Sequence, residues 1–419
     1  MKISAKKIIF LHLYIDIFAR ILPNISSSIA VVSYIPDLLN AILFGFVIRE
    51  CFCKKIKEDI RRLIFGVVVL FSFDVIMFLI KGESFLLFLW GVRNQYRFII
   101  FLVACAMFLN NKDLSKLKDI LMRCFWINMV AVTIELILGY RQDLLGGTFG
   151  LDHSCNGVTN IFLCIICSYA IVFWIGRKVS MKKMMVLVIG SLYWALMAEI
   201  KVFFLELILI TAIAIFFERG KVDKKMYLLI VGSIGMAVSI LLISYVFPSQ
   251  AFVFSPRGLI NYAAKVNVGV GRLFAIPKIT ISLFKKDIWL ELFGIGLGNG
   301  EMMSLGSILI ESKFFSQYGV RYAYTTYLHA LLYVERGVVG LIWYVWLYGK
   351  SFKVSYSQVK KRKFVTLNYM VMILVVCFYI IAIYDASLKT SSGGYMGYLV
   401  LAIPYMINYA QDKIYKKTR

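Results

Sequence analysis

Charged residues are scarce in this chain of 419 residues: Asp, Glu, Lys and Arg make up 17% of it, whereas 61% is hydrophobic. The mean hydropathy of +0.80 excludes a soluble globular domain of this length. Short segments of alternating apolar and polar residues, which a transmembrane β-barrel requires, are also lacking. We therefore expect an all-α polytopic membrane protein that forms a single integral membrane domain over residues 1–419.

Apolar segments of about the 20 residues that cross a bilayer as a helix recur along the whole chain. The first is short and carries Asp16 and Arg20, so an amphipathic helix on the membrane surface is the alternative there. Glu199 and Lys201 interrupt one apolar run, which predicts a tight turn with a local ion pair. We predict twelve transmembrane helices, at residues 8–22, 27–48, 63–80, 94–110, 120–139, 155–175, 184–200, 202–217, 226–247, 331–349, 364–384 and 393–410.

Acidic residues are few, 23 against 47 basic ones, which gives a formal net charge of +24. The basic residues collect in alternate loops instead of one patch, a pattern typical of membrane topology and not of nucleic-acid binding. The termini and the loops on their side hold 30 of the 47, whereas the short connections on the opposite side hold five. Both termini are therefore expected to be cytoplasmic.

The eight cysteines are scattered and predict neither a disulfide framework nor a metal site. Two close pairs exist, Cys51 with Cys53 and Cys164 with Cys167, but no second ligand pair lies near either one. Ordinary packing is therefore the better interpretation. No cleavable signal peptide is expected, because no small-residue cleavage site follows the first apolar run.

Glycine occupies every second position in one apolar run, LFGIGLGNG at residues 292–300. A dinucleotide-binding turn needs G-x-G-x-x-G, but the sixth position is Asn299 counted from Gly294 and Glu301 counted from Gly296. No Gly-Lys-Ser or Gly-Lys-Thr follows, which excludes a Walker loop. The run also falls on the extracytoplasmic side, where nucleotides are absent, so no cofactor is expected.

Only one connection is long: residues 248–328, which form an extracytoplasmic loop of 81 residues. Apolar stretches such as LFAIPKITISLF predict short helices within it, and long ordered loops are usually functional. A cationic, partly apolar lid suits an anionic lipid head group, with a simple headgroup-binding surface as the alternative. The loop has eight basic residues (Arg257, Lys265, Arg272, Lys278, Lys285, Lys286, Lys313, Arg321) and four acidic ones (Asp287, Glu291, Glu301, Glu311).

Three ordered segments carry a family resemblance: GGTFGLDHSCNGVTNIFL at residues 146–163, VGVGRLFAIPKITISLF running on to LFGIGLGNG, and TTYLHALLYVERGVVGLIWYVW at residues 325–346. Each is similar to one motif of a known family. In order, these motifs are a Gly-Thr-Phe-Gly turn, a Gly-Arg helix before a Phe-Gly-x-Gly-x-Gly turn, and a His-containing segment that ends in Glu-x-Gly-x-x-Gly. Together with the predicted spans and loop, they resemble the O-antigen polymerase (Wzy) and O-antigen ligase superfamily of bacterial polysaccharide assembly.

The resemblance implies a glycosyltransferase of the bacterial cytoplasmic (inner) membrane that polymerises repeat units of O-antigen or capsule. Its donor and acceptor would be oligosaccharides linked to undecaprenyl pyrophosphate, joined by an inverting reaction at the outer membrane face. No metal is expected, since the outer loop has no Asp-x-Asp and no His/Cys cluster. The implied partners are membrane lipids and a chain-length regulator, and nucleic acid is not among them.

Two other functions stay open. An O-antigen ligase would use the same donor but deliver the glycan to lipid A core, and the residues do not separate it from a polymerase. A transporter or flippase is the more distant alternative. Transporters commonly contain two related halves, whereas here eight predicted spans precede residue 218 and four follow it.

Arg272 and His329 are the candidate catalytic residues. Arg272 follows Gly269 and Gly271, and a guanidinium can bind pyrophosphate oxygens bidentately where a lysine cannot. A contact with a lipid headgroup is the alternative. A neutral His329 would accept the proton of the attacking sugar hydroxyl, with an interfacial, hydrogen-bonded histidine as the alternative.

The candidate substrate-binding residues are cations, aromatics and two residues beside the Gly-Thr-Phe-Gly turn. Arg97 is expected either to pair with Asp74 or to bind pyrophosphate, because a cation within a span needs an anionic partner. Aromatic rings near Arg321 would stack on sugar faces, although tyrosine also populates membrane interfaces. The set is Arg257, Arg321, Arg97, Arg93, His153, Asp152 and Tyr324.

The remaining candidates are structural. Glu335 lies deeper in its predicted span than His329, and an intramembrane acid usually pairs with another group. Gly337 would allow close helix packing. Gly294, Gly296 and Gly298 are expected to shape the turn of the glycine run.

Overall fold

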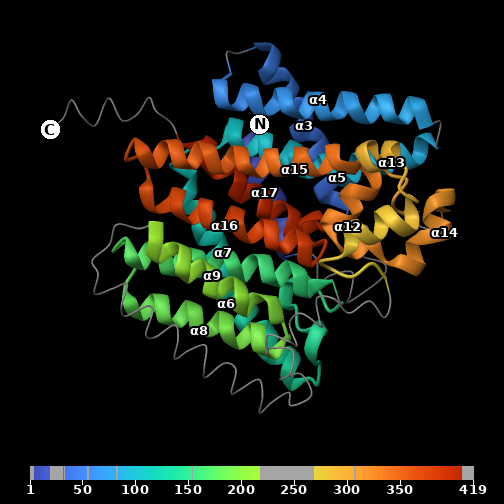
Figure 1. Cartoon of the computed structure of the whole chain (residues 1–419). Coiled ribbons are helices and arrows are strands. Elements are labelled where there is room, and N and C mark those ends of the chain that lie inside the picture. The colour runs from blue at the N-terminus through green and yellow to red at the C-terminus, as the bar shows by residue number, and fades with distance from the viewer. Residues whose placement is uncertain are drawn as a thin grey trace.

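The computed structural model describes residues 4–18, 32, 34–53, 56–81, 84–152, 154–217, 269–305 and 308–407. Most of these residues are helical, and the helices pack into one bundle (Figure 1). The longer ones are α1 (Ala5–Phe18), α3 (Ile35–Cys53), α4 (Glu58–Lys81), α5 (Phe85–Phe108), α6 (Asp113–Ile137), α7 (Cys155–Ile175), α8 (Met181–Met197), α9 (Lys201–Phe217), α15 (Leu328–Lys360), α16 (Val365–Tyr384) and α17 (Ser391–Met406).

The helices agree with a membrane protein of the all-α class. Six of the described helices, α4, α5, α6, α7, α15 and α16, are long and apolar enough to cross a membrane. Eleven of the twelve predicted spans overlap a described helix, while the one at residues 226–247 lies outside the described residues. The total of twelve spans therefore stays a prediction.

Helix α7 forms the centre of the bundle, and α4 lies at its edge. Helix α7 packs against α8, α9, α16 and α17, and nearly all of its residues are buried. Helices α4 and α6 instead expose large apolar side chains, such as Phe65 and Leu79 on α4 and Val130 on α6. Apolar side chains exposed along a whole helix are typical of contact with lipid.

The predicted tight turn between α8 and α9 is confirmed. Helix α8 ends at Met197 and α9 begins at Lys201, with Glu199 between them at a φ of 54°. Lys201 Nζ lies 4.0 Å from Glu199 Oε2, which is the local ion pair expected there.

The described part of the long loop, residues 269–327, forms a small lid. It contains α12 (Ala275–Lys278), the π-helical turn η5 (Ile279–Leu283), α13 (Ile288–Phe293), α14 (Lys313–Tyr322) and the 3₁₀ turn η6 (Tyr324–Thr326). Beyond the expected short helices, strands β1 (Met303–Leu305) and β2 (Ile308–Ile310) pair antiparallel, with Ser304 opposite Leu309. Residues 248–268 of the predicted loop lie outside the described residues.

The lid has its own apolar core, which packs on the start of α15. Val270, Phe284 and Tyr324 from the lid are buried together with Leu331 and Tyr333 of α15. Figure 1 places α12, α13 and α14 together at one end of the bundle. We call this the lid end, and we call the opposite end, with connections 109–112, 176–180 and 361–364, the basic end.

Candidate functional site

The glycine run forms a tight turn that is hydrogen-bonded to α15. Gly294, Gly296 and Gly298 all have positive φ, of 71°, 99° and 84°. A Cβ on Gly298 would lie 2.0 Å from the backbone oxygen of Leu87 in α5, so only glycine fits there. Glycine at alternate positions therefore allows the positive φ angles of the turn and, at Gly298, its close contact with α5.

A break in α15 provides the hydrogen-bond acceptors for this turn. Gly337 has a φ of 59° and a ψ of −149° within α15. Backbone carbonyls just before such a break lose their helical partners. The Val334 and Glu335 carbonyls accept instead from Ile295 and Gly296, at 2.9 and 3.0 Å.

The side chain of Glu335 is hydrogen-bonded to the same turn. The amide of Gly298 donates to Glu335 Oε1 at 3.0 Å, and the carboxyl is fully buried. A Cβ on Gly337 would lie 2.4 Å from the carbonyl carbon of Leu292. In this structure both residues therefore hold the glycine turn against α15.

A buried ion pair joins α4 to α15 next to this turn. Arg336 donates to Asp74 through Nε and Nη2, each at 2.7 Å, and the hydroxyl of Tyr96 donates to the same carboxylate at 2.6 Å. The sequence-based alternative that Arg97 pairs with Asp74 is wrong. Asp74 is already engaged by Arg336 and Tyr96, whereas the guanidinium of Arg97 lies beside Asp37.

Three cations gather at the lid end between α3, α5 and the segment after α16. Arg93 donates to Asp37 and, at 3.1 Å, to Asn94. Arg97 lies 3.5 Å from Asp37 and donates to the backbone oxygen of Lys389 at 3.3 Å. We call Arg93, Arg97, Lys389, Asp37 and Glu301 the cation cluster.

Lys389 connects this cluster to the lid. Its Nζ lies 2.6 Å from Glu301 Oε1, and Asn94 donates to the other oxygen of Glu301 at 3.0 Å. Glu301 directly follows the glycine turn. The cluster holds three cations against two carboxylates in a half-buried position, and the buried carboxyl of Glu335 also interacts electrostatically with Lys389.

Arg272 and His329, the predicted catalytic pair, lie together beside the end of α16. Arg272 Nε donates to the backbone oxygen of Tyr384 at 3.2 Å, and its guanidinium stacks 4.4 Å from the ring of Tyr384. His329 Nδ1 lies 3.1 Å from the backbone oxygen of Ala382, and its ring also faces the backbone of Arg272. A carbonyl only accepts, so in the neutral ring the proton on Nδ1 satisfies the oxygen of Ala382.

Asp385 lies next to this pair and was not predicted. Its carboxylate accepts from the amide and the hydroxyl of Ser387, at 2.8 and 2.5 Å. Burial raises the pKa of Asp385 above its ordinary value, although Ser387 and the charge of Arg272 oppose the rise. Because Lys389 follows in the turn η7 (Ser387–Lys389), residues 385–389 connect the Arg272 pair with the cation cluster.

The other predicted site residues lie apart from this centre. Arg321 is exposed on α14 with its guanidinium 5.6 Å from the ring of Tyr322. Tyr324 is fully buried in the lid core, so its ring does not face solvent, and burial raises the pKa of its phenol. Asp152 accepts from the amide of Ser154 at 2.7 Å, just before α7. Arg257 and His153 lie outside the described residues.

The Gly-Thr-Phe-Gly turn is held from α6. The amide of Gly147 donates to Glu135 at 3.1 Å, and the amide of Thr148 donates to Asn128 at 2.6 Å. Within the described residues, no group of three or more His, Cys, Asp or Glu side chains could hold a metal ion. The chain matches no protein-family model, and no curated protein is significantly similar to it.

Proposed function

We propose that the protein is a polysaccharide repeat-unit polymerase, a glycosyltransferase whose donor and acceptor are oligosaccharides linked to undecaprenyl pyrophosphate. The observation that carries this proposal is the meeting of Arg272 and His329 at the lid end, next to a cluster of three cations. The family resemblance of the sequence supports the same reaction. In this proposal the lid end faces the outer side of the bacterial cytoplasmic membrane.

The chemistry requires one bond to form as another breaks. A sugar hydroxyl of the incoming unit attacks the anomeric carbon of the growing glycan, and the carbon–oxygen bond to the lipid pyrophosphate breaks. The hydroxyl proton passes to the unprotonated ring nitrogen of His329. Pyrophosphate departs as an anion, and Arg272 binds its oxygens.

The cation cluster would provide a second contact for the same leaving group. Arg93 and Arg97 hold one more positive charge than Asp37, the carboxylate that they share, neutralises. A pyrophosphate near this cluster would compensate that charge in a partly buried place, where electrostatic attraction is strong. The lipid tail of the donor would stay in the bilayer beside the spans.

The test is a glycan gel from purified protein in liposomes that contain only lipid-linked repeat units. Wild type should give a regular ladder without metal or nucleotide, and Arg272→Ala should give none at unchanged protein level. Arg272→Lys should also fail, because an ammonium cannot bind pyrophosphate bidentately. The matched control is Arg141→Ala, an exposed arginine at the same end, which should keep the full ladder.

The same assay separates the alternatives. Full polymer from both Arg272 variants would overturn the assignment of Arg272. Transfer to added lipid A core without a ladder would identify an O-antigen ligase. Movement of lipid-linked units across the vesicle without any chain growth would instead favour a transporter or flippase.

A further inference from the structure

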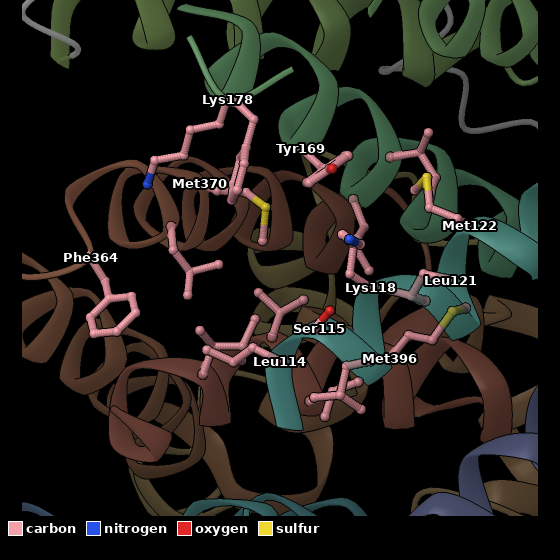
Figure 2. A pocket seen from close by; sticks show the side chains of 18 of the residues that line it. Leu114, Ser115, Lys118, Leu121, Met122, Tyr169, Lys178, Phe364, Met370 and Met396 are labelled. Atoms are coloured by element: carbon pink, nitrogen blue, oxygen red, sulfur yellow. The ribbon is translucent and has the colours of Figure 1, made fainter. Parts of the chain in front are cut away.

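A cavity of about 280 Å³ opens at the basic end, where Asn111, Lys178 and Phe364 line it. Figure 2 shows its lining side chains from close by. It lies between α6, α7, α16 and α17, and residues such as Leu121, Ile165, Met370 and Val400 line it. Its few polar wall residues are Asn111, Ser115, Lys118, Tyr169 and Lys178. The cavity is therefore an apolar space with amines at its edge.

The depth of the cavity matches one leaflet of a bilayer. Its lining extends from Leu114 to Met122 on α6 and from Ile165 to Phe173 on α7. Eight residues of α-helix rise about 12 Å, whereas half of a hydrocarbon core is about 15 Å. Three of the four wall helices, α6, α7 and α16, are long and apolar enough to cross a membrane, so most of the cavity would lie at the depth of the hydrocarbon.

The two lysines at the edge come from different segments of the chain. Figure 2 shows Lys118 of α6 and Lys178, just after α7, on different sides of the opening. Lys118 lies 3.3 Å from Asp119, an exposed pair that contributes little. Lys178 Nζ lies 5.7 Å from the ring of Phe173, which also lines the cavity.

The surroundings of the opening are strongly positive. Residues 109–119 and 176–183 include seven basic and two acidic residues. One of the two acids, Asp113, is paired with Lys6 at 2.6 Å, and the other is Asp119. An anion at the opening would therefore meet excess positive charge.

We infer that this cavity binds an anionic phospholipid, with one acyl chain between α6, α7, α16 and α17 and the phosphate between Lys118 and Lys178. The apolar wall suits a hydrocarbon chain, which a soluble anion lacks. The lysines suit a phosphate, which an apolar peptide lacks. The tail at residues 408–419 is itself basic, with four Lys or Arg residues, so like charges disfavour it as the occupant.

The test uses full-length protein released from vesicles of phosphatidylcholine with a minor share of phosphatidylglycerol, examined by native mass spectrometry. Wild type should retain one phosphatidylglycerol. Lys118→Ala/Lys178→Ala should retain about thirtyfold less, because each lysine near a membrane surface contributes about 1 kcal/mol and a factor of ten corresponds to about 1.4 kcal/mol. The control is Lys182→Ala/Lys183→Ala, which removes two exposed lysines of the same end that do not line the cavity.

Several outcomes would overturn the inference. These are equal retention of phosphatidylcholine, an equal loss in the control variant, unchanged retention in the Lys118/Lys178 variant, or displacement of the lipid by soluble glycerol phosphate. Equal melting temperatures of the two double variants would show that lost binding is not lost folding. Arg272→Ala should keep the lipid, so this result does not depend on polymerase activity.

Discussion

At the scale of single residues, the pair of Asp74 and Arg336 is the most deeply buried of the ion pairs described above. Its two hydrogen bonds of 2.7 Å join positions 262 residues apart in the chain. Such a pair stabilises only because neither charge is left alone, since the desolvation of each ion is costly. The Asp74–Arg336 pair joins α4 to α15 next to Gly337, at the break where the glycine turn packs against α15.

Removal of one partner should therefore cost more than removal of both. Asp74→Asn leaves the guanidinium of Arg336 without a counter-charge, and we expect a loss of about 3–5 kcal/mol. The double variant Asp74→Leu/Arg336→Met should lose clearly less. Thermal unfolding in detergent measures both, and equal losses would show that the pair is not coupled. Tyr96→Phe, which removes one donor to Asp74, should cost only about 1 kcal/mol.

Asp385 should make stability depend on pH. Its pKa is raised in the folded protein, so the folded state holds its proton more tightly than the unfolded state does. The resulting stabilisation is present below the ordinary pKa near 4 and is lost as pH rises through the raised value. Asp385→Asn keeps an acceptor for Ser387 and cannot ionise.

The comparison is of melting temperatures between pH 4 and pH 8. Relative to wild type, Asp385→Asn should gain stability as pH rises across this window. A difference between the two proteins that does not change with pH would contradict the raised pKa.

At the scale of elements, the positions of most helices could be predicted because a chain in lipid must satisfy its backbone groups within each segment. Long apolar runs therefore marked the helices, and Glu199 marked the turn between α8 and α9. The break in α15 could not be predicted, because a glycine within a span also allows close helix packing, which is the role expected of Gly337. Its reason is the contact with α13, a segment far away in sequence.

The glycine turn yields a test at this scale. Gly298→Ala places a Cβ 2.0 Å from the oxygen of Leu87 and at a φ of 84°. We expect a loss of about 2–4 kcal/mol from strain and overpacking, with loss of product. Gly45→Ala on α3 is the matched control, since nothing lies within 4 Å of its added Cβ. If both variants melt like wild type, the close contact of the turn with α5 is not required.

At the scale of the whole molecule, the candidate site combines residues from distant parts of the chain. Short sequence patterns do not show which distant residues meet in the fold. Arg272 and His329 could be chosen as candidate catalytic residues from the sequence motifs directly around them. Asp37, Glu301, Asp385 and Lys389 were missed as partners, because each is a single polar residue near an apolar span. The signal available for the last two was the polar stretch YDASLKTSSGG between two spans, which is too short to indicate which residues it meets.

Orientation is the property on which the proposed chemistry depends, and cysteine labelling tests it. Six of the eight native cysteines are buried, so Cys51→Ser/Cys53→Ser gives a background with little reaction. In this background, Arg141→Cys places a thiol at the lid end and Lys361→Cys places one at the basic end. Both parent residues are exposed.

A membrane-impermeant maleimide should label Arg141→Cys in spheroplasts, and Lys361→Cys only after the membrane is broken. The reason is that basic loops stay in the cytoplasm, and the basic residues gather at the end that carries Lys361. The reverse pattern would place Arg272, His329 and the cation cluster on the cytoplasmic side. A polymerase that receives lipid-linked units on the outer face could not then use them, so the assignment of function would fail with the orientation.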